Sequence, residues 1–309
     1  MCHHRCLSTC FRYLDYFGSA DLKDRKNAVF LTILAGILWG TSFPAIKIGL
    51  EFVNPYMFTF LRMSLASVFV FMISYATHNL KASLAKNRLF WYLGLLNGLA
   101  YLIQHVGIQY TAASKSSLLV NLSAVWVAAL SWLILKERLS KNRLLGIALG
   151  LAGVFFITTN LNLPGLTQGT IFGDGLVFLS GILWSFFIVY NKRGVGAHKT
   201  LQLMPWIFLA TTLPLAPFIL VQNNFVLLNL SLDAWIFIVY TAVLCWLIPY
   251  YLWLKGLKHV SPTVSTVILL AEVVVAITVS FFFLGETFTM VSGIGAILIL
   301  SAIILVSFS

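Results

Sequence analysis

The chain has 309 residues, of which 60% are hydrophobic and only 9% are charged, and its mean hydropathy is +0.94. Soluble domains carry about 25% charged residues, so this composition excludes a soluble protein. The net charge of +11 does not indicate a nucleic-acid partner, because the basic residues lie in short clusters between apolar runs. Such clusters are an orientation signal of membrane proteins and not a binding stripe.

Residues 1–28 precede the first long apolar run and are predicted to form a cytoplasmic tail. Three cysteines and two histidines gather there: Cys2, Cys6, Cys10, His3 and His4. The cysteine spacing would place thiolates on one helix face for a metal. The favoured alternative is a tail that binds no metal, because no known zinc spacing matches. No metal site or cofactor is therefore predicted.

Apolar runs of about 20 residues recur after the tail, and each is long enough to cross roughly 30 Å of hydrocarbon. Lipid offers no partners for open backbone groups, so every span is expected to be a helix. The predicted fold is an all-α membrane protein with ten transmembrane helices. In chain order the expected spans are 29–50, 55–77, 89–110, 114–135, 142–159, 173–191, 200–221, 232–254, 261–284 and 290–308.

The Lys and Arg residues divide between the two sides of these spans. With the amino terminus inside, the inner segments hold 17 of the 20, and the outer loops hold only Lys115. Lys47 and Arg62 fall inside spans. Since positive residues are retained on the cytoplasmic side, both termini are predicted to be cytoplasmic, in a cell or inner membrane.

The chain also contains an internal repeat. Residues 36–49 and 181–194 share six of fourteen positions at a shift of 145 residues, and residues 135–146 align with 284–295 at a shift of 149. Each copy holds five expected spans, and this odd number forces the copies into opposite orientations, as in many secondary transporters. The predicted organisation is a first repeat over 29–159, an outer loop over 160–172 and a second repeat over 173–309.

These features resemble the drug/metabolite transporter superfamily, specifically its ten-span EamA-type proteins. In the first copy the resemblance is carried by Trp39, Gly40, Lys47, Arg62, Leu135, Glu137, Gly146, Gly150 and Gly153. In the second copy it is carried by Trp184, Lys192, Leu284, Glu286 and Gly295. The resemblance covers residues 29–308. It implies export or exchange of small metabolites, often amino acids or related compounds, through a central cavity formed mainly by spans 1, 3, 4, 6, 8 and 9.

The sequence therefore predicts a secondary-active transporter of small polar metabolites that works by alternating access, as a monomer or homodimer in the lipid bilayer. No GxxxxGK[ST] loop is present, which argues against a built-in ATPase. The alternatives are an intramembrane enzyme and a channel. An enzyme would need a clustered catalytic set near one interface, and nothing in the sequence selects one.

Glu272 is the sharpest candidate site residue. It lies about eleven residues into the ninth span, roughly 16 Å deep and near the midplane. A charge at that depth costs about 2.5–3.5 kcal/mol, so the side chain is expected to face a cavity or to be neutral. A neutral acid suits a proton carrier, and an ionised one would pair with a substrate ammonium. The alternative is a protonated glutamic acid that bonds a neighbouring helix.

Three basic residues are candidates for coupling or gating. Arg62 would pair with an anionic substrate group or a carboxylate, although a structural or gating role is favoured because the family motif places an Arg there. Lys47 and Lys192 are repeat counterparts at span ends. Snorkelling to the membrane surface is the expectation for both, and service at opposite gates is the alternative.

The remaining candidates are expected to line a central site. Pro44 interrupts the first span, because it removes one backbone bond and frees the carbonyl of Gly40. Polar residues of the third span recur on one helix face, which should turn away from lipid. The predicted lining is Trp39, Ser42, Pro44, Tyr101, Gln104, His105, Asn121, Trp184, Trp246 and Tyr250, together with Glu272. Glu137 and Glu286, which end the fourth and ninth spans, are interpreted as anchors or helix caps.

Overall fold

A computed structural model describes residues 25–108, 110, 118–162, 170–217, 230–284 and 288–308. Within these ranges every regular element is a helix and there is no strand. Eight helices there are long and apolar enough to cross a membrane, and Thr200–Leu215 is a shorter apolar helix. The prediction of an all-helical fold is confirmed for these ranges. The cysteine-rich tail, Lys115 and Glu286 lie outside the described residues.

Short polar residues begin most of these helices. The first half contributes α2 (Arg25–Gly40), α3 (Ser42–Gly49), α4 (Pro55–Ala76), the 3-10 turn η1 (Ala82–Lys86), α5 (Arg88–Ile108), α7 (Ser123–Leu135) and α8 (Lys141–Thr159). The side-chain oxygens of Asn54 and Ser140 accept from backbone amides in the first turns of α4 and α8. Each cap satisfies one amide that the helix itself leaves open.

The second half follows the same pattern. It contributes α9 (Ile171–Ala197), α10 (Thr200–Thr212), the 3-10 turn η3 (Leu213–Leu215), α12 (Leu232–Ala242), the π-helical turn η5 (Val243–Leu247), α13 (Ile248–Leu257), α14 (Pro262–Leu269), α15 (Ala271–Leu284) and α16 (Met290–Ser307). Caps from Thr170, Ser231, Ser261 and Thr289 fix the starts of α9, α12, α14 and α16.

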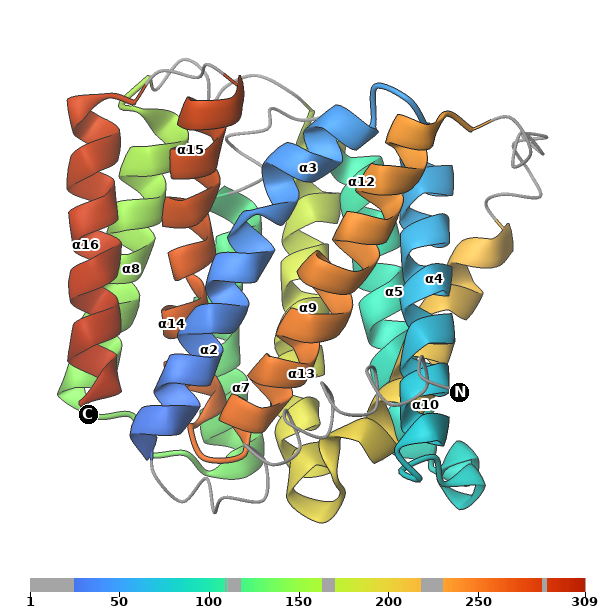
Figure 1. The fold of residues 1–309 in the computed structure, drawn as a ribbon. Coiled ribbons are helices and arrows are strands. Elements are labelled where there is room, and N and C mark those ends of the chain that lie inside the picture. Colours follow the sequence, from blue (N-terminus) through green and yellow to red (C-terminus); the bar gives the residue numbers. More distant parts are fainter. Residues whose placement is uncertain are drawn as a thin grey trace.

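The helices form a bundle with two flanks and a centre. Figure 1 shows α8 and α16 side by side at one flank, and α4, α5 and α10 at the other. Between them α2 packs on α13, α14 and α15, and α9 packs on α5 and α7. Large apolar side chains such as Phe282 and Phe283, which are 73% and 77% exposed, cover the outside. In a bilayer these side chains would contact lipid, so their exposure carries no hydrophobic cost.

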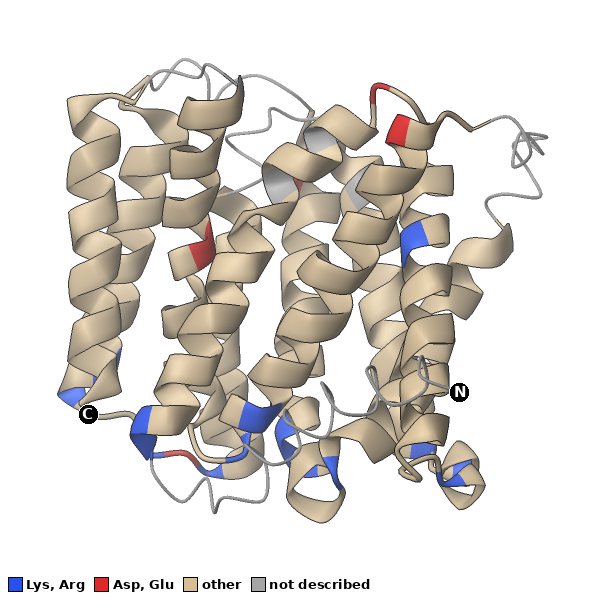
Figure 2. Cartoon of the chain, in the orientation of Figure 1, with Lys and Arg blue, Asp and Glu red and all other residues tan. Residues whose placement is uncertain are grey.

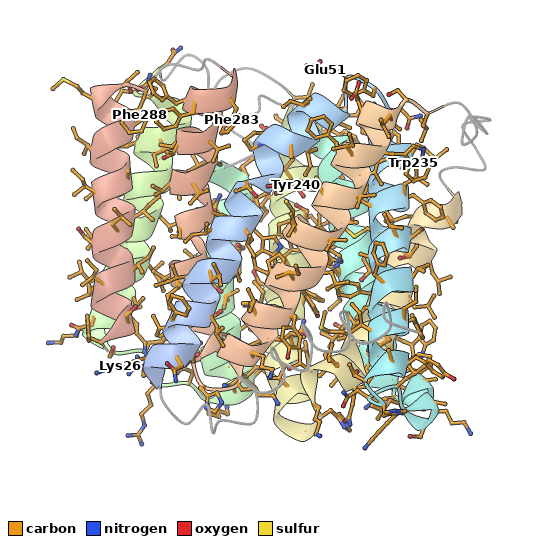
Figure 3. The ribbon with its side chains drawn as sticks, viewed as in Figure 1. Lys26, Glu51, Trp235, Tyr240, Phe283 and Phe288 are labelled. Atoms are coloured by element: carbon orange, nitrogen blue, oxygen red, sulfur yellow. The ribbon has the colours of Figure 1, made fainter. Side chains whose placement is uncertain are left out.

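Charged residues are concentrated at one end of this bundle. Figure 2 shows most of the described Lys and Arg residues gathered at the end where α2 begins and α13 ends. Glu51 lies at the opposite end, in the turn between α3 and α4 (Figure 3). The basic clusters that the sequence assigns to one side of the membrane therefore share one end of the fold.

Candidate functional site

The first span is interrupted near Pro44, as its sequence predicts. Pro44 has no amide hydrogen, so the carbonyl of Gly40 loses its helical partner. α2 ends at Gly40, and α3 begins at Ser42 after a turn at Thr41. Ser42 and Pro44 are both buried. The counterpart of Pro44 in the second half is Val189, and there α9 runs unbroken from Ile171 to Ala197.

Two further interruptions were not predicted, and they occupy nearly equivalent places in the two halves, since the repeat shift of 149 residues relates Leu122 to Ala271, the neighbour of Leu270. Leu270 separates α14 from α15, and the amide of Val273 reaches back only three residues to its carbonyl, at 3.0 Å. Leu122 does the same before α7, where the amide of Val125 donates to its carbonyl at 3.0 Å. The two leucines have nearly the same backbone angles, with φ near −58° and ψ −14°. Asn121 precedes one turn, and Glu272 follows the other.

The interruptions of the first and ninth spans contact each other. A Cβ atom at Gly40 would come within 2.7 Å of the Glu272 carbonyl oxygen and 2.6 Å of the Val275 Cβ. Only glycine permits this approach, because real Cβ contacts are not so short. Glu272 is the eleventh residue of the 22-residue apolar stretch Pro262–Phe283, so the contact lies at its middle. The side chain of Glu272 is partly buried.

A pair of equivalent glycines, one in each half, makes matching contacts with the other half. Gly36 of α2 faces Leu269 and Ala271, with a built Cβ 3.5–3.6 Å from their atoms. Its repeat counterpart Gly181, on α9, faces Leu119 and Val120 at 3.3–3.5 Å. Each half therefore places a glycine of its first helix against the interrupted helix of the other half.

Thr41 connects the interruption in the first span to the π-helical turn η5. Its hydroxyl accepts a hydrogen bond from the Tyr240 hydroxyl at 3.0 Å, donates to the Leu38 carbonyl at 2.8 Å, and lies 3.6 Å from the Cys245 Sγ. Tyr240 extends from α12 beside the first span (Figure 3). Sequence reasoning missed Tyr240 and Cys245. Pro249 was the available signal, because it removes the helical partner of the Cys245 carbonyl.

Five predicted aromatic residues form one continuous cluster. The Tyr101 ring centroid lies 5.2 Å from that of Trp184 and 5.5 Å from that of Trp246. Trp246 continues to Tyr250 at 5.5 Å. Through Trp253, which the prediction of the lining omitted, the cluster reaches Trp39 at 6.0 Å. Edge-on and tilted pairs of this kind stabilise beyond their buried area.

The cluster differs in how well its polar atoms are satisfied. The fully buried Tyr250 donates its hydroxyl to Asn191 at 3.0 Å, and the Trp253 indole donates to Ser265 at 2.9 Å. The buried indole nitrogens of Trp184 and Trp246 have no acceptor among the described residues. Tyr250 thus acts as a packing anchor. The two indole nitrogens beside Tyr101, in contrast, are donors without an acceptor among the described residues.

Arg62 lies beside Tyr101, in the part of the cluster where buried donors have no acceptor among the described residues. Its side chain is 5% exposed, and its guanidinium carbon lies 5.9 Å from the centroid of the Tyr101 ring. Its buried Nε has no acceptor, and no carboxylate of the described chain lies within ion-pair distance of it.

The polar face predicted on α5 has mixed roles. The buried Asn97 donates to the Thr211 hydroxyl of α10 at 3.2 Å, which is a packing contact. Gln104 is partly buried, as is Asn121 before α7. The side chains of His105 and Lys47 lie outside the described residues, so their predicted roles stay predictions.

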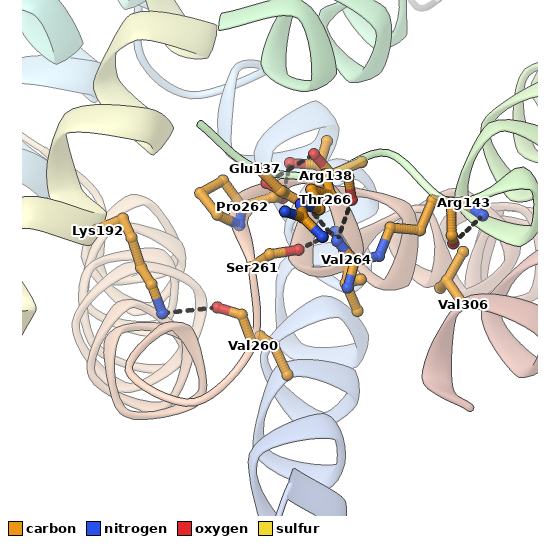
Figure 4. A network of polar contacts seen from close by, with 12 residues as sticks. Glu137, Arg138, Arg143, Lys192, Val260, Ser261, Pro262, Val264, Thr266 and Val306 are labelled. Atoms are coloured by element: carbon orange, nitrogen blue, oxygen red, sulfur yellow. Dashed lines mark hydrogen bonds and ion pairs between the residues drawn. The ribbon is translucent and has the colours of Figure 1, made fainter. Parts of the chain in front are cut away.

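Lys192, for which snorkelling to the membrane surface stays a prediction, binds backbone carbonyls of the second half. Its Nζ donates to the carbonyls of Leu257, Lys258 and Val260 at 2.6, 2.9 and 2.9 Å, the last of which is drawn in Figure 4. The amine thereby caps the carboxyl end of α13, where open carbonyls attract a positive charge. Burial and the nearby charge of Lys199 lower the pKa of Lys258.

Glu137 joins the two halves at the same end of the bundle. Its Oε1 pairs with Arg143 Nη1 at 2.9 Å, and its Oε2 accepts from the Thr263 hydroxyl at 3.1 Å. Thr263 is the second residue of α14 in the second half, so the contact crosses between the halves. A surface pocket beside it is lined by Trp132, Leu133, Lys136, Glu137, Arg138 and Leu139.

Interrupted helices that meet in the middle of a helical bundle are found in many secondary transporters. A sequence model of the EamA-like transporter family matches residues 26–159 and matches again over residues 171–308. The chain belongs to the EamA-like transporter family, and the resemblance to the drug/metabolite transporter superfamily is confirmed.

Full-length relatives agree with this assignment. The chain is 28% identical over 278 residues to an uncharacterized transporter of Archaeoglobus fulgidus, covering 89% of this chain and 95% of that protein. It is 24% identical over 276 residues to the uncharacterized transporter YoaV of Bacillus subtilis, covering 88% and 94%. A solved crystal structure shares the fold, with a TM-score of 0.78 at 18% identity over 91% of this chain and 96% of that one.

Proposed function

We propose that this protein is a secondary-active carrier, an exporter or exchanger of small polar metabolites such as amino acids or related compounds, that works by alternating access. The observation that carries the proposal is the contact between the interruptions at Gly40 and Glu272, in the middle of the bundle. Interrupted helices expose backbone groups and hydroxyls that bind a polar solute or act as a hinge.

The architecture proposed for this carrier is ten spans in two inverted five-helix repeats, over 29–159 and 173–309, with both termini cytoplasmic. The double match of the family supports a duplication. The equivalent contacts of Gly36 and Gly181 support a two-fold relation between the halves. The basic clusters at one end support the orientation, since positive residues favour the cytoplasmic side.

At the basic end, the contact between Glu137 and Thr263 would hold the site closed to that side. The cap that Lys192 provides fixes the loop before α14 beside it. Opening to that side would require this network to separate, because it spans the two halves that move in alternating access.

Glu272 is the proposed coupling residue. In the ionised form it would attract a substrate ammonium, and in the neutral form it would carry a proton across. Both roles need access from each side in turn, which a hinge at Leu270 would provide. Exchange of substrate for a proton at this one carboxyl is the simplest form of coupling.

A ligand screen on the purified protein tests the proposal. Amino acids, nucleotides, sugars, amines and drugs are added in turn, and a bound substrate raises the melting temperature by linkage. Each hit is then offered in radiolabelled form to proteoliposomes and to protein-free liposomes. The proposal requires uptake that saturates with concentration in the proteoliposomes. Uptake that rises linearly with concentration would instead favour a channel. Chemical conversion of the hit would favour an enzyme.

A further inference from the structure

Three buried nitrogen donors without acceptors surround the Tyr101 ring. Arg62 reaches the ring from α4, Trp184 from α9 and Trp246 from η5. The Nε of Arg62 and the indole nitrogens of both tryptophans are buried, and none has a hydrogen-bond partner in the described part of the chain. Buried polar groups are nearly always hydrogen-bonded, so three open donors around one ring require an explanation.

The three groups cannot satisfy one another. Guanidinium and indole N–H groups are donors only, so each needs an acceptor from elsewhere. The Tyr101 ring face attracts the guanidinium at 5.9 Å, but it does not replace a carboxylate for a charge that is 5% exposed. The missing partner is therefore an acceptor with negative charge.

We infer that Arg62, Trp184 and Trp246 form an anion subsite that binds the carboxylate group of the transported metabolite. The inference rests on the proposed carrier function and narrows its substrate class to carboxylate-bearing metabolites. A carboxylate offers two oxygens in the plane that a guanidinium fork matches.

An open indole nitrogen alone does not define the subsite. Trp206 of α10 also has a buried indole nitrogen without an acceptor, but its ring packs edge-on against Phe71 at 5.4 Å. The subsite is distinguished by the shared neighbour Tyr101 and by the guanidinium over it. Trp206 therefore supplies a matched control.

The test uses matched probes on the full chain in nanodiscs. Acetate, benzoate and phenylalanine are each compared with their carboxamides at equal concentration and ionic strength, and the melting temperature is recorded. The carboxylates should stabilise the wild type more than the carboxamides do. In Arg62→Gln the apparent affinity for the carboxylates should fall about tenfold or more, as expected when a charge-assisted hydrogen bond is lost.

The tryptophan variants make the test independent of how well Arg62→Gln folds. Trp184→Phe and Trp246→Phe should each reduce the preference for carboxylates, whereas Trp206→Phe should leave it unchanged. Arg62→Lys should retain part of it, since it keeps the charge and loses the planar fork. Equal shifts with carboxylates and carboxamides in the wild type, or a preference that persists in Arg62→Gln, would overturn the subsite.

Transport measurements separate this inference from the carrier function. Saturable uptake of a solute without a carboxylate that ignores Arg62→Gln would overturn the anion subsite and leave the carrier intact. Stabilisation selective for carboxylates, with no saturable uptake of any solute, would support the subsite and overturn the carrier.

Discussion

Gly40 lies against the backbone carbonyl of Glu272, so close that a Cβ atom at position 40 would come within 2.7 Å of the carbonyl oxygen. The first of these residues ends α2, and the second lies in the first turn of α15. The contact therefore joins an interruption from each half of the chain.

Gly40→Ala should impair both folding stability and transport. The added methyl group would meet backbone and the branched Val275 side chain, so the two helices must separate, at a cost of about 1–3 kcal/mol. Gly36→Ala, one turn earlier on the same helix, meets its neighbours at an ordinary 3.5 Å and should be tolerated. Melting temperature and initial uptake rate measure both variants. Equal behaviour of the two would show that the close approach at Gly40 is unimportant.

Glu272→Gln should abolish the response of transport to a pH gradient. The amide keeps the shape of the side chain but neither ionises nor carries a proton at physiological pH. Uptake is measured with and without a pH gradient at fixed membrane voltage. Glu51→Gln, an exposed acid beyond the end of α3, serves as the control and should keep the response. An undiminished pH response in Glu272→Gln would exclude the coupling role.

Thr263→Val should favour opening at the basic end. It removes the hydroxyl that donates to Glu137 across the halves. Arg143→Gln, which removes the partner of Glu137 within the same half, is the comparison variant. A hydrogen bond to a charged group contributes about 1.5–3 kcal/mol, enough to shift a two-state equilibrium by tenfold or more. Spin labels placed beside Lys141 and Lys258 would report the change as a longer distance population. No change in Thr263→Val would show that this contact is not part of a gate.

Lys192→Met should lower the melting temperature through loss of the cap on α13. The substitution keeps much of the chain length and removes the donor to three carbonyls, at a cost of about 1–2 kcal/mol. Lys141→Met, at an exposed position of the same end, should have little effect. If both variants melt alike, the capping contacts contribute nothing measurable.

Sequence patterns predicted the interruptions only where a residue type enforces them. Pro44 lacks an amide hydrogen, so the break after Gly40 was visible in the sequence. The turns at Leu122 and Leu270 contain neither proline nor glycine, and their apolar surroundings read as continuous helix. Both turns lie beside a helix of the other half, α9 or α2, and no local pattern encodes such a contact.

The candidate site was predicted as a set of residue types but not as a set of contacts. Periodicity places Tyr101 and Tyr250 on inward faces. It cannot show that the Tyr250 hydroxyl donates to Asn191, or that two indoles without acceptors among the described residues flank the Tyr101 ring. Likewise, the position of Lys192 at a span end suggested snorkelling. The cap became visible only once the loop after α13 was placed beside it.

Solute counterflow tests the central claim most directly. Proteoliposomes are loaded with an excess of unlabelled ligand from the stabilisation screen and diluted into a trace of the same labelled ligand. A carrier that alternates between two faces predicts a transient accumulation of label above its external concentration, saturable by external ligand and absent from protein-free liposomes. Label that only equilibrates, without an overshoot at any loading, would contradict alternating access.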